Sequence, residues 1–151
     1  MTPWLSDADI EAICAAGNVK LVWNETDKAG MATPASRAVY IPRIRDVETL
    51  LVALHELGHV LGEPAHVANK QEYREYMGQD EANAWLWALE NVPVMCDEIV
   101  TPILYRLNSY FQMKEVYGDG GYTCEEWCLV MDLLGCAYDP VLNRYDRREN
   151  L

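Results

Sequence analysis

Leucines recur at helical spacing in the middle of the chain. Leu50, Leu54 and Leu57 lie three or four residues apart, which places their side chains on one face of an α-helix. Asp46 can cap the first turn of that helix by accepting a hydrogen bond from a backbone N–H. The pattern predicts a helix over residues 46–62 whose leucine face lies in the core.

The segment before this helix carries shorter patterns. An apolar stripe follows a capping sequence and predicts a helix over residues 7–16. Apolar and polar residues alternate over 19–23, whereas residues 35–41 are rich in β-formers and end at a proline, so both segments are predicted as strands of one small sheet. The glycine and the proline between them predict a loop over 28–34.

The segment after the central helix is predicted to be helical in three stretches. Residues 80–91 are rich in strong helix formers, residues 95–117 contain Pro102 as a kink or break, and residues 123–134 end at a glycine. The polar residues 143–151 are expected to be mobile. These elements predict a mostly helical α+β protein with a small β-sheet before the central helix.

The length and the charge of the chain limit the number of domains and the classes of function that are expected. A chain of 151 residues and 17.2 kDa suits a single domain over 1–151. Lys and Arg number 12 against 24 Asp and Glu, and the net charge of −12 disfavours binding to nucleic-acid phosphates. The apolar stretches are shorter than the roughly 20 residues that cross a bilayer. The acidic start lacks the basic residues of a secretory signal, so a cytoplasmic protein is expected.

The chain has five cysteines, an odd number. They stand at Cys14, Cys96, Cys124, Cys128 and Cys136, without the dense, even spacing of a disulfide-rich secreted domain. The last three also lack the second pair of a zinc ribbon. We therefore expect reduced thiols that pack as small hydrophobic residues.

The sharpest motif is an HExxH sequence in the middle of the central helix. Its histidines, His55 and His59, stand four residues apart and stack one turn over the other, so that both imidazoles can bind one zinc ion. Glu56 points about 100° away from His55 around the helix, too far round to be the natural third ligand but suited to act as the general base. Gly58 is costly inside a helix, and we expect it to leave room for another element or for substrate.

A hydrolytic zinc site needs a third protein ligand, and three candidates follow the motif: Glu81, His66 and Asp80. Glu81 lies near the start of the next predicted helix, where one carboxylate can turn into the site. His66 follows the motif shortly, but the metzincin pattern places its histidine where Ala65 stands. Asp80 is better explained as the cap of the helix, and Glu90 lies at the far end. Glu81 is therefore the preferred ligand and His66 the alternative.

These features resemble the ImmA/IrrE-type zinc peptidases. The resemblance covers roughly residues 19–92. It rests on the order of two strands, the HELGH helix and a following helix that carries Glu81, Ala82, Asn83, Trp85 and Ala88.

The resemblance implies a zincin-like core of the gluzincin group over residues 19–92. In that family two histidines and a glutamate on the next helix bind Zn²⁺, which here are His55, His59 and Glu81, while Glu56 activates water. Members are typically bacterial or phage-borne and often act on a partner regulator protein. The remaining residues match no part of the family pattern, and we treat 93–151 as a helical C-terminal extension.

The sequence therefore predicts a zinc-dependent metallopeptidase that hydrolyses a peptide bond in a specific partner or regulatory protein, either constitutively or from a latent state. The strand 35–41 is expected to offer a free edge to an extended peptide. Tyr73 and Tyr76 are candidate oxyanion donors, although packing is the more common role of tyrosines in an aromatic-rich chain.

A second class of function is compatible with the charge. An acidic surface can capture a basic protein partner. In that alternative the protein is a binding or decoy protein, and its zinc site is structural or vestigial. Neither function predicts direct binding to nucleic acid or to a membrane.

Overall fold

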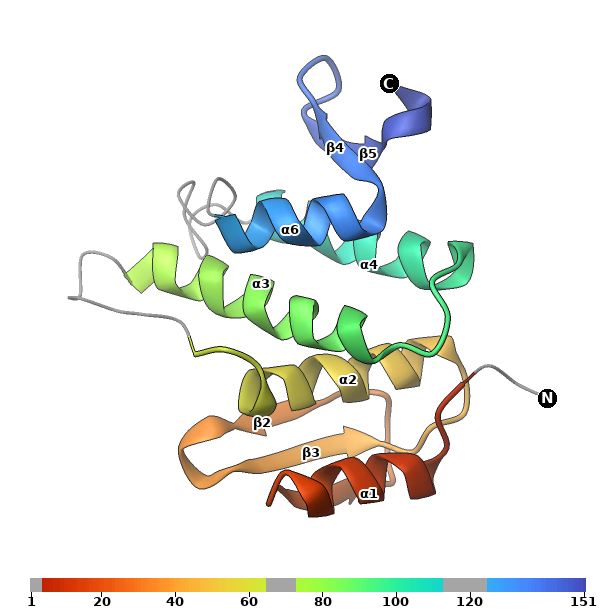
Figure 1. The fold of residues 1–151 in the computed structure, drawn as a ribbon, viewed down its shortest axis with the longest axis vertical. Helices are drawn as coiled ribbons and strands as arrows, with labels where there is room; N and C mark the ends of the chain where they lie inside the picture. The colour runs from red at the N-terminus through yellow and green to blue at the C-terminus, as the bar shows by residue number, and fades with distance from the viewer. Residues whose placement is uncertain (1–3, 65–72, 113–124) are drawn as a thin grey trace. The chain divides into compact units, whose positions relative to one another are not determined.

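The computed structural model describes residues 4–64, 73–112 and 125–151. Over these residues the protein is α+β and mostly helical, as predicted, with five α-helices and two small sheets (Figure 1). The chain divides into two compact units, formed by Met1–Glu63 with Ala84–Met95 and by Pro64–Asn83 with Cys96–Leu151. The single-domain organisation stays a prediction.

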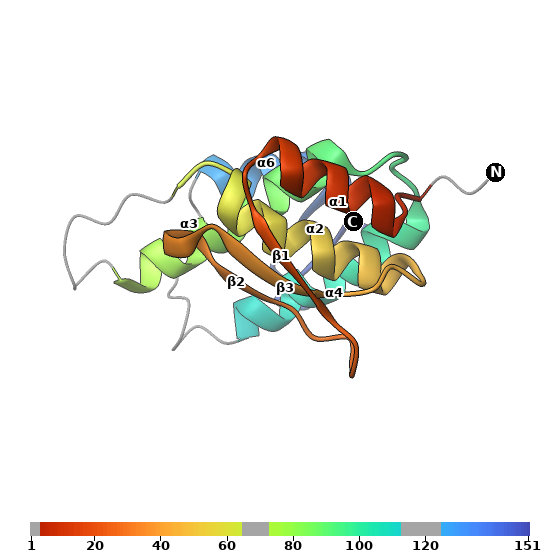
Figure 2. The same ribbon diagram turned by 90° about the horizontal axis from the view of Figure 1, so that it is seen from below.

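The first unit contains a three-stranded sheet (Figure 2). Its central strand, β3 (Ala38–Pro42), pairs in parallel with β1 (Lys20–Asn24) and antiparallel with β2 (Met31–Thr33). β1 and β3 confirm the two predicted strands, although β3 begins later than expected because Pro34–Ser36 form a short 3₁₀ turn.

Strand β2 corrects two expectations. It lies in the segment 28–34, which was predicted as a loop, because three residues are too few to show an alternating pattern and the neighbouring glycine and proline indicate a turn. It also occupies the side of β3 that was expected to be open. The strand predicted at 35–41 is therefore central, and among the described residues β2 forms the edge on that side.

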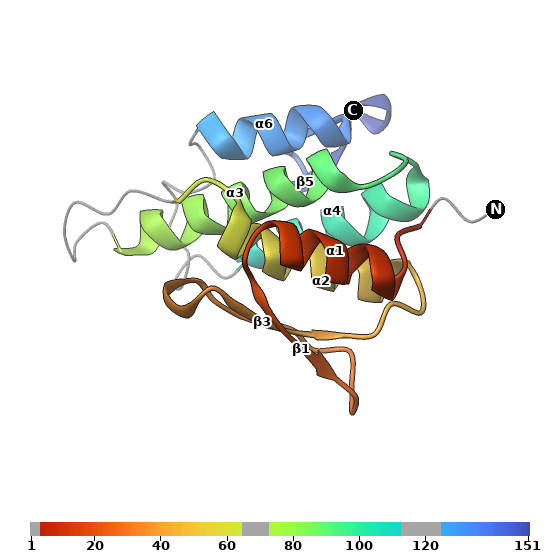
Figure 3. The ribbon, with the colours of Figure 1, turned by 60° about the horizontal axis from the view of Figure 1, so that its bottom comes forward.

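One face of this sheet is covered by two helices. Val39 and Ile41 of β3 are buried, whereas Tyr40 between them is exposed, which is the alternation expected of a sheet with one covered face. Helix α1 (Asp7–Ala16) contacts β1, and helix α2 (Val47–Leu61) contacts β2 and β3, on the same side of the sheet (Figure 3). Both helices have the predicted bounds to within one residue.

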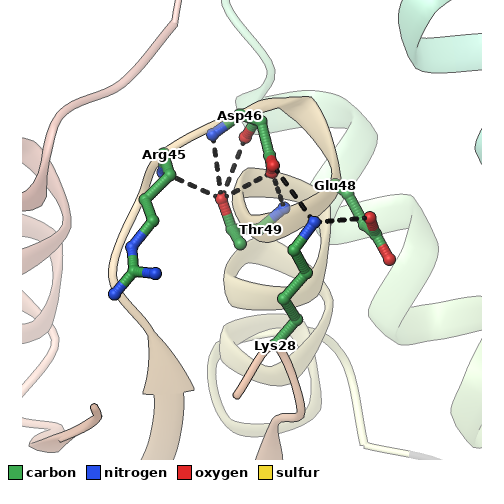
Figure 4. A network of polar contacts seen from close by, with 5 residues as sticks. All are labelled: Lys28, Arg45, Asp46, Glu48 and Thr49. Carbon is green, nitrogen blue, oxygen red and sulfur yellow. Dashed lines mark hydrogen bonds and ion pairs between the residues drawn. The ribbon is translucent and has the colours of Figure 1, made fainter. Parts of the chain in front are cut away.

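The start of α2 is fixed by a capping box (Figure 4). The side chain of Asp46 accepts a hydrogen bond from the backbone N–H of Thr49 at 2.8 Å, and the Thr49 hydroxyl accepts one from the N–H of Asp46 at 3.1 Å. The Lys28 ammonium lies 3.3 Å from the Asp46 carboxylate and 3.2 Å from that of Glu48. This contact ties the segment before β2 to the first turn of α2.

Helix α3 (Tyr73–Asn91) starts earlier than the sequence indicated. The prediction began at residue 80 and used Asp80 as the cap, but Asp80 lies inside the helix, so that assignment was wrong. The glycine in the segment 73–79 costs about 1 kcal/mol relative to alanine inside a helix, and the Asp80-Glu81 sequence is typical of a helix start, so the pattern placed the helix start too late.

The second unit contains two further helices and a hairpin. These are α4 (Asp97–Gln112), α6 (Glu125–Leu134), β4 (Cys136–Asp139) and β5 (Arg144–Arg147). Helices α4 and α6 confirm two predicted helices, and Pro102 lies inside α4.

The C-terminal segment 143–151 was expected to be mobile, and the structure corrects this. β5 pairs with β4, and the side-chain amide of Asn108 in α4 donates to the backbone oxygen of Tyr145 at 2.9 Å. The N–H of Tyr145 donates in turn to the Asn108 amide oxygen at 2.7 Å. Arg147 also donates to Asp97 at 2.6 Å. The polar residues are used in pairing, which composition alone does not reveal.

The cysteines differ in their surroundings. Cys14 and Cys136 are buried, as expected for small hydrophobic residues, whereas Cys128 is exposed on α6. Burial raises the pKa of the Cys14 and Cys136 thiols, which keeps them protonated and unreactive. Cys124 lies outside the described residues.

No described helix is both long enough and apolar enough to cross a bilayer.

Candidate metal centre

The two histidines of the HExxH motif face one point. His55 and His59 lie on successive turns of α2, and their Nε2 atoms are 3.2 Å apart. The ring centroids are 4.6 Å apart, with the ring planes at 78°. Two nitrogens bound at about 2.0–2.1 Å to a tetrahedral zinc ion are about 3.3 Å apart, so this spacing fits shared coordination. A hydrogen bond between the two ring nitrogens has a similar length. A third ligand side chain close to both nitrogens favours a metal site over such a hydrogen bond.

The third side chain is Glu81 of α3. One ligand atom from each of His55, His59 and Glu81 lies within 4.8 Å of the other two. His55 is buried, while His59 and Glu81 are partly exposed. Two neutral imidazoles and one carboxylate form a donor set used by catalytic zinc sites, in which the remaining position stays open. The residues therefore fit a divalent metal by both spacing and chemistry.

A close contact between backbones brings α3 to this point. A Cβ atom built on Gly58 of α2 would lie 2.2 Å from the backbone oxygen of Ala84 in α3. Only a residue without a side chain permits that approach, because a real Cβ never comes so near to a backbone atom. The expectation that Gly58 leaves room for another element is confirmed. Glu81 precedes Ala84 by three residues and lies on a neighbouring position of the same helix surface.

The ring of Trp85 packs against the ring of His55. Its ring lies 4.3 Å from the His55 ring, centroid to centroid, with the planes tilted by 33°. Trp85 is fully buried, and His55 is only 5% exposed. A large rigid ring against one imidazole restricts its rotamer, which holds the Nε2 atom toward His59. In the sequence, Trp85 was notable only as one of the residues that carry the family resemblance. No pattern indicated that its ring lies against His55.

Glu56 lies on α2 beside the sheet edge. A Cβ atom built on Gly30, the residue just before β2, would lie 2.8 Å from Cγ of Glu56 and 2.7 Å from Cγ1 of Val52. Glu56 is partly exposed. The general base predicted from the motif is therefore adjacent to the start of edge strand β2, a contact that no sequence pattern indicated.

Other candidates are placed elsewhere or fall outside the described part. Glu90 is exposed near the end of α3. His66 lies outside the described residues, so its role as alternative ligand stays a prediction. Tyr73 and Tyr76 begin α3, but their side chains are likewise outside the described part.

Comparison of the chain with protein-family models, with curated proteins and with solved structures finds no match. The function is therefore inferred from the three side chains that converge on one point and from the elements around them.

Proposed function

We propose that this protein is a zinc-dependent metallopeptidase of zincin type. The observation that carries the proposal is the convergence of His55, His59 and Glu81, with their ligand atoms within 4.8 Å of one another. The order of these residues along the chain is that of the ImmA/IrrE-type peptidases, and the small sheet before the HExxH helix agrees with that resemblance.

The side chains have separate roles in this proposal. His55, His59 and Glu81 hold the metal, and Trp85 keeps the His55 ring in place. A bound zinc ion would act as a Lewis acid toward the peptide carbonyl and lower the pKa of water toward about 7. Glu56 accepts a proton from the attacking water on its carboxylate and then delivers it to the amine that leaves.

The substrate is an extended peptide bound along β2. This strand pairs only with β3 among the described residues, so its other side has backbone N–H and C=O groups available for a further strand. Gly30, which precedes β2, lies against Glu56. The main chain of a peptide paired with β2 would therefore lie beside Glu56, the proposed general base. This assignment replaces the one at 35–41, because β3 is paired on both sides.

The proposed substrate is a specific partner or regulatory protein in the cytoplasm of a bacterial or phage-infected cell. The net charge of −12 favours a partner with a basic surface and disfavours nucleic acid. The partner then brings one segment to the edge of β2.

Metal analysis of four variants tests the proposal. We expect about one zinc per wild-type chain, loss of zinc in His55→Ala and Glu81→Ala, and retention of zinc with loss of hydrolysis in Glu56→Gln. Glu90→Ala is the matched control, because Glu90 is an exposed carboxylate on the same helix as Glu81. It should keep both zinc and activity.

Two results would redirect the proposal. Full zinc in Glu81→Ala together with loss in His66→Ala would assign the third position to His66. A biological effect that survives Glu56→Gln, and partner binding that weakens steeply with salt, would favour the acidic binding or decoy function.

A further inference from the structure

Gly30 is set against the side chain proposed as the general base. Its missing Cβ would meet Val52 Cγ1 at 2.7 Å and Glu56 Cγ at 2.8 Å, and it would lie 3.6 Å from Glu56 Cδ. The backbone of Gly30 does not require glycine, since Gly135 is the one described glycine with positive φ. Space for the neighbouring side chains is therefore the reason for glycine here.

The backbone around Gly30 is held from both sides. On one side Ala29 is fixed by two hydrogen bonds: Asn24 Nδ2 donates to its oxygen at 3.0 Å, and its N–H donates to Asp27 at 2.8 Å. On the other side Met31 pairs with Tyr40 of β3. An added side chain at position 30 cannot easily be relieved by a shift of the strand.

The two neighbours differ in how far they can move. Val52 is buried and β-branched, so its χ1 angle has little freedom inside α2. Glu56 is partly exposed and has an unbranched side chain with several rotatable bonds. A methyl group at position 30 would therefore displace Glu56 more easily than Val52 or the strand.

We propose that Gly30 is a positioning residue for Glu56: the bare backbone before β2 leaves the space in which the Glu56 side chain directs its carboxylate toward the metal centre. This inference rests on the proposed function. It adds that the β1–β2 connection, which contributes no ligand, sets the orientation of the general base.

The test uses acetohydroxamate, a small metal ligand whose hydroxyl proton needs an acceptor beside the metal. Zinc-loaded wild type, Glu56→Gln, Gly30→Ala and Gly17→Ala are titrated with acetohydroxamate by calorimetry, after zinc content and thermal unfolding have been measured. Gly17→Ala is the matched control, because its added Cβ would also lie 2.7 Å from an α2 side chain, that of Leu61. Leu61 lies two residues beyond the motif and outside the ligand set.

We expect Gly30→Ala to keep one zinc per chain and to bind acetohydroxamate at least about 10-fold more weakly than wild type, as Glu56→Gln does. Gly17→Ala should bind it as wild type does. If Gly30→Ala does not fold, the double variant Gly30→Ala/Val52→Ala relieves the contact with Val52 and keeps the one with Glu56. The double variant should bind acetohydroxamate at least about 10-fold more weakly than Val52→Ala alone.

The outcomes separate the inference from the proposed function. Unchanged affinity in Gly30→Ala, or in the double variant, with reduced affinity in Glu56→Gln overturns the role of Gly30 and leaves the metallopeptidase intact. Absence of zinc from wild type, or binding that does not depend on Glu56, overturns the proposed function and the inference with it.

Discussion

Helices α2 and α3 both contribute to the metal centre, but their positions are determined in different ways. α2 is defined by local contacts, with the Asp46 capping box at its start and a 2.8 Å hydrogen bond from the Gly62 N–H to the Gly58 oxygen at its end. The site-bearing part of α3 is positioned by packing, through Ala84 against Gly58 and Trp85 against His55. Two of the three ligand side chains are therefore placed by local contacts within α2, and the third depends on how α3 packs against α2.

The strongest test of this difference is Gly58→Ala. The new methyl group would meet the backbone oxygen of Ala84 at 2.2 Å, so α3 would have to move away from α2. We expect the free energy of unfolding to fall by about 2–3 kcal/mol, despite the better helix propensity of alanine. The zinc affinity should fall at least about 100-fold, because the Glu81 carboxylate moves with its helix.

Chemical denaturation and competition with a zinc chelator measure these two effects. Gly17→Ala is again the control, since the contact it creates is with the flexible end of the Leu61 side chain. A Gly58→Ala protein with wild-type zinc affinity would show that the position of Glu81 does not depend on this contact.

A smaller effect is expected for Trp85→Phe. The smaller ring leaves a void beside His55 and should lower the free energy of unfolding by about 1–2 kcal/mol. Zinc affinity should fall about 10-fold because the His55 ring gains freedom. Trp87→Phe, on a partly exposed position of the same helix, should change both quantities less.

Tryptophan fluorescence gives an independent readout of the stack. Because Trp85 contacts His55 directly, binding of Co²⁺ should quench its emission, and Trp85→Phe should remove most of that quenching. Equal quenching in Trp85→Phe and wild type would place the metal away from His55.

The smallest effect is expected at the start of α2. Asp46→Ala removes the cap and should lower the free energy of unfolding by about 1 kcal/mol without changing zinc affinity. The Thr49 N–H holds the pKa of Asp46 below its usual 3.8. The stabilisation is therefore present above pH 3.8 and is lost as the pH falls through the lower pKa of the folded state.

Denaturation of wild type and Asp46→Ala at several pH values checks this prediction. The difference in the free energy of unfolding between the two proteins should be largest near neutral pH and should decrease in strong acid. Glu48→Ala is the control, because Glu48 pairs with the exposed Lys28 but does not cap the helix, and it should change stability by less than about 0.5 kcal/mol. A larger effect in Glu48→Ala than in Asp46→Ala would contradict the capping explanation.

The sequence predicted the helices that begin with clear caps and carry an apolar face. α1 and α2 both have these marks, and their predicted bounds agree with the structure to within one residue. Several elements without such marks were missed in whole or in part. β2 is too short to show a period, the first turns of α3 contain a glycine and precede an apparent cap at Asp80, and β5 is a polar strand stabilised by pairing with β4 and by Asn108.

By itself the sequence determined that two histidines stand one helical turn apart and that a glutamate follows the first of them. These relations depend only on residue spacing within one helix, and helix geometry converts that spacing directly into direction. The tertiary structure decided that Glu81 meets the histidines, that Trp85 lies against His55 and that Gly30 lies against Glu56. Each of these contacts joins segments distant in the chain, and its geometry depends on how the helices and the sheet pack together.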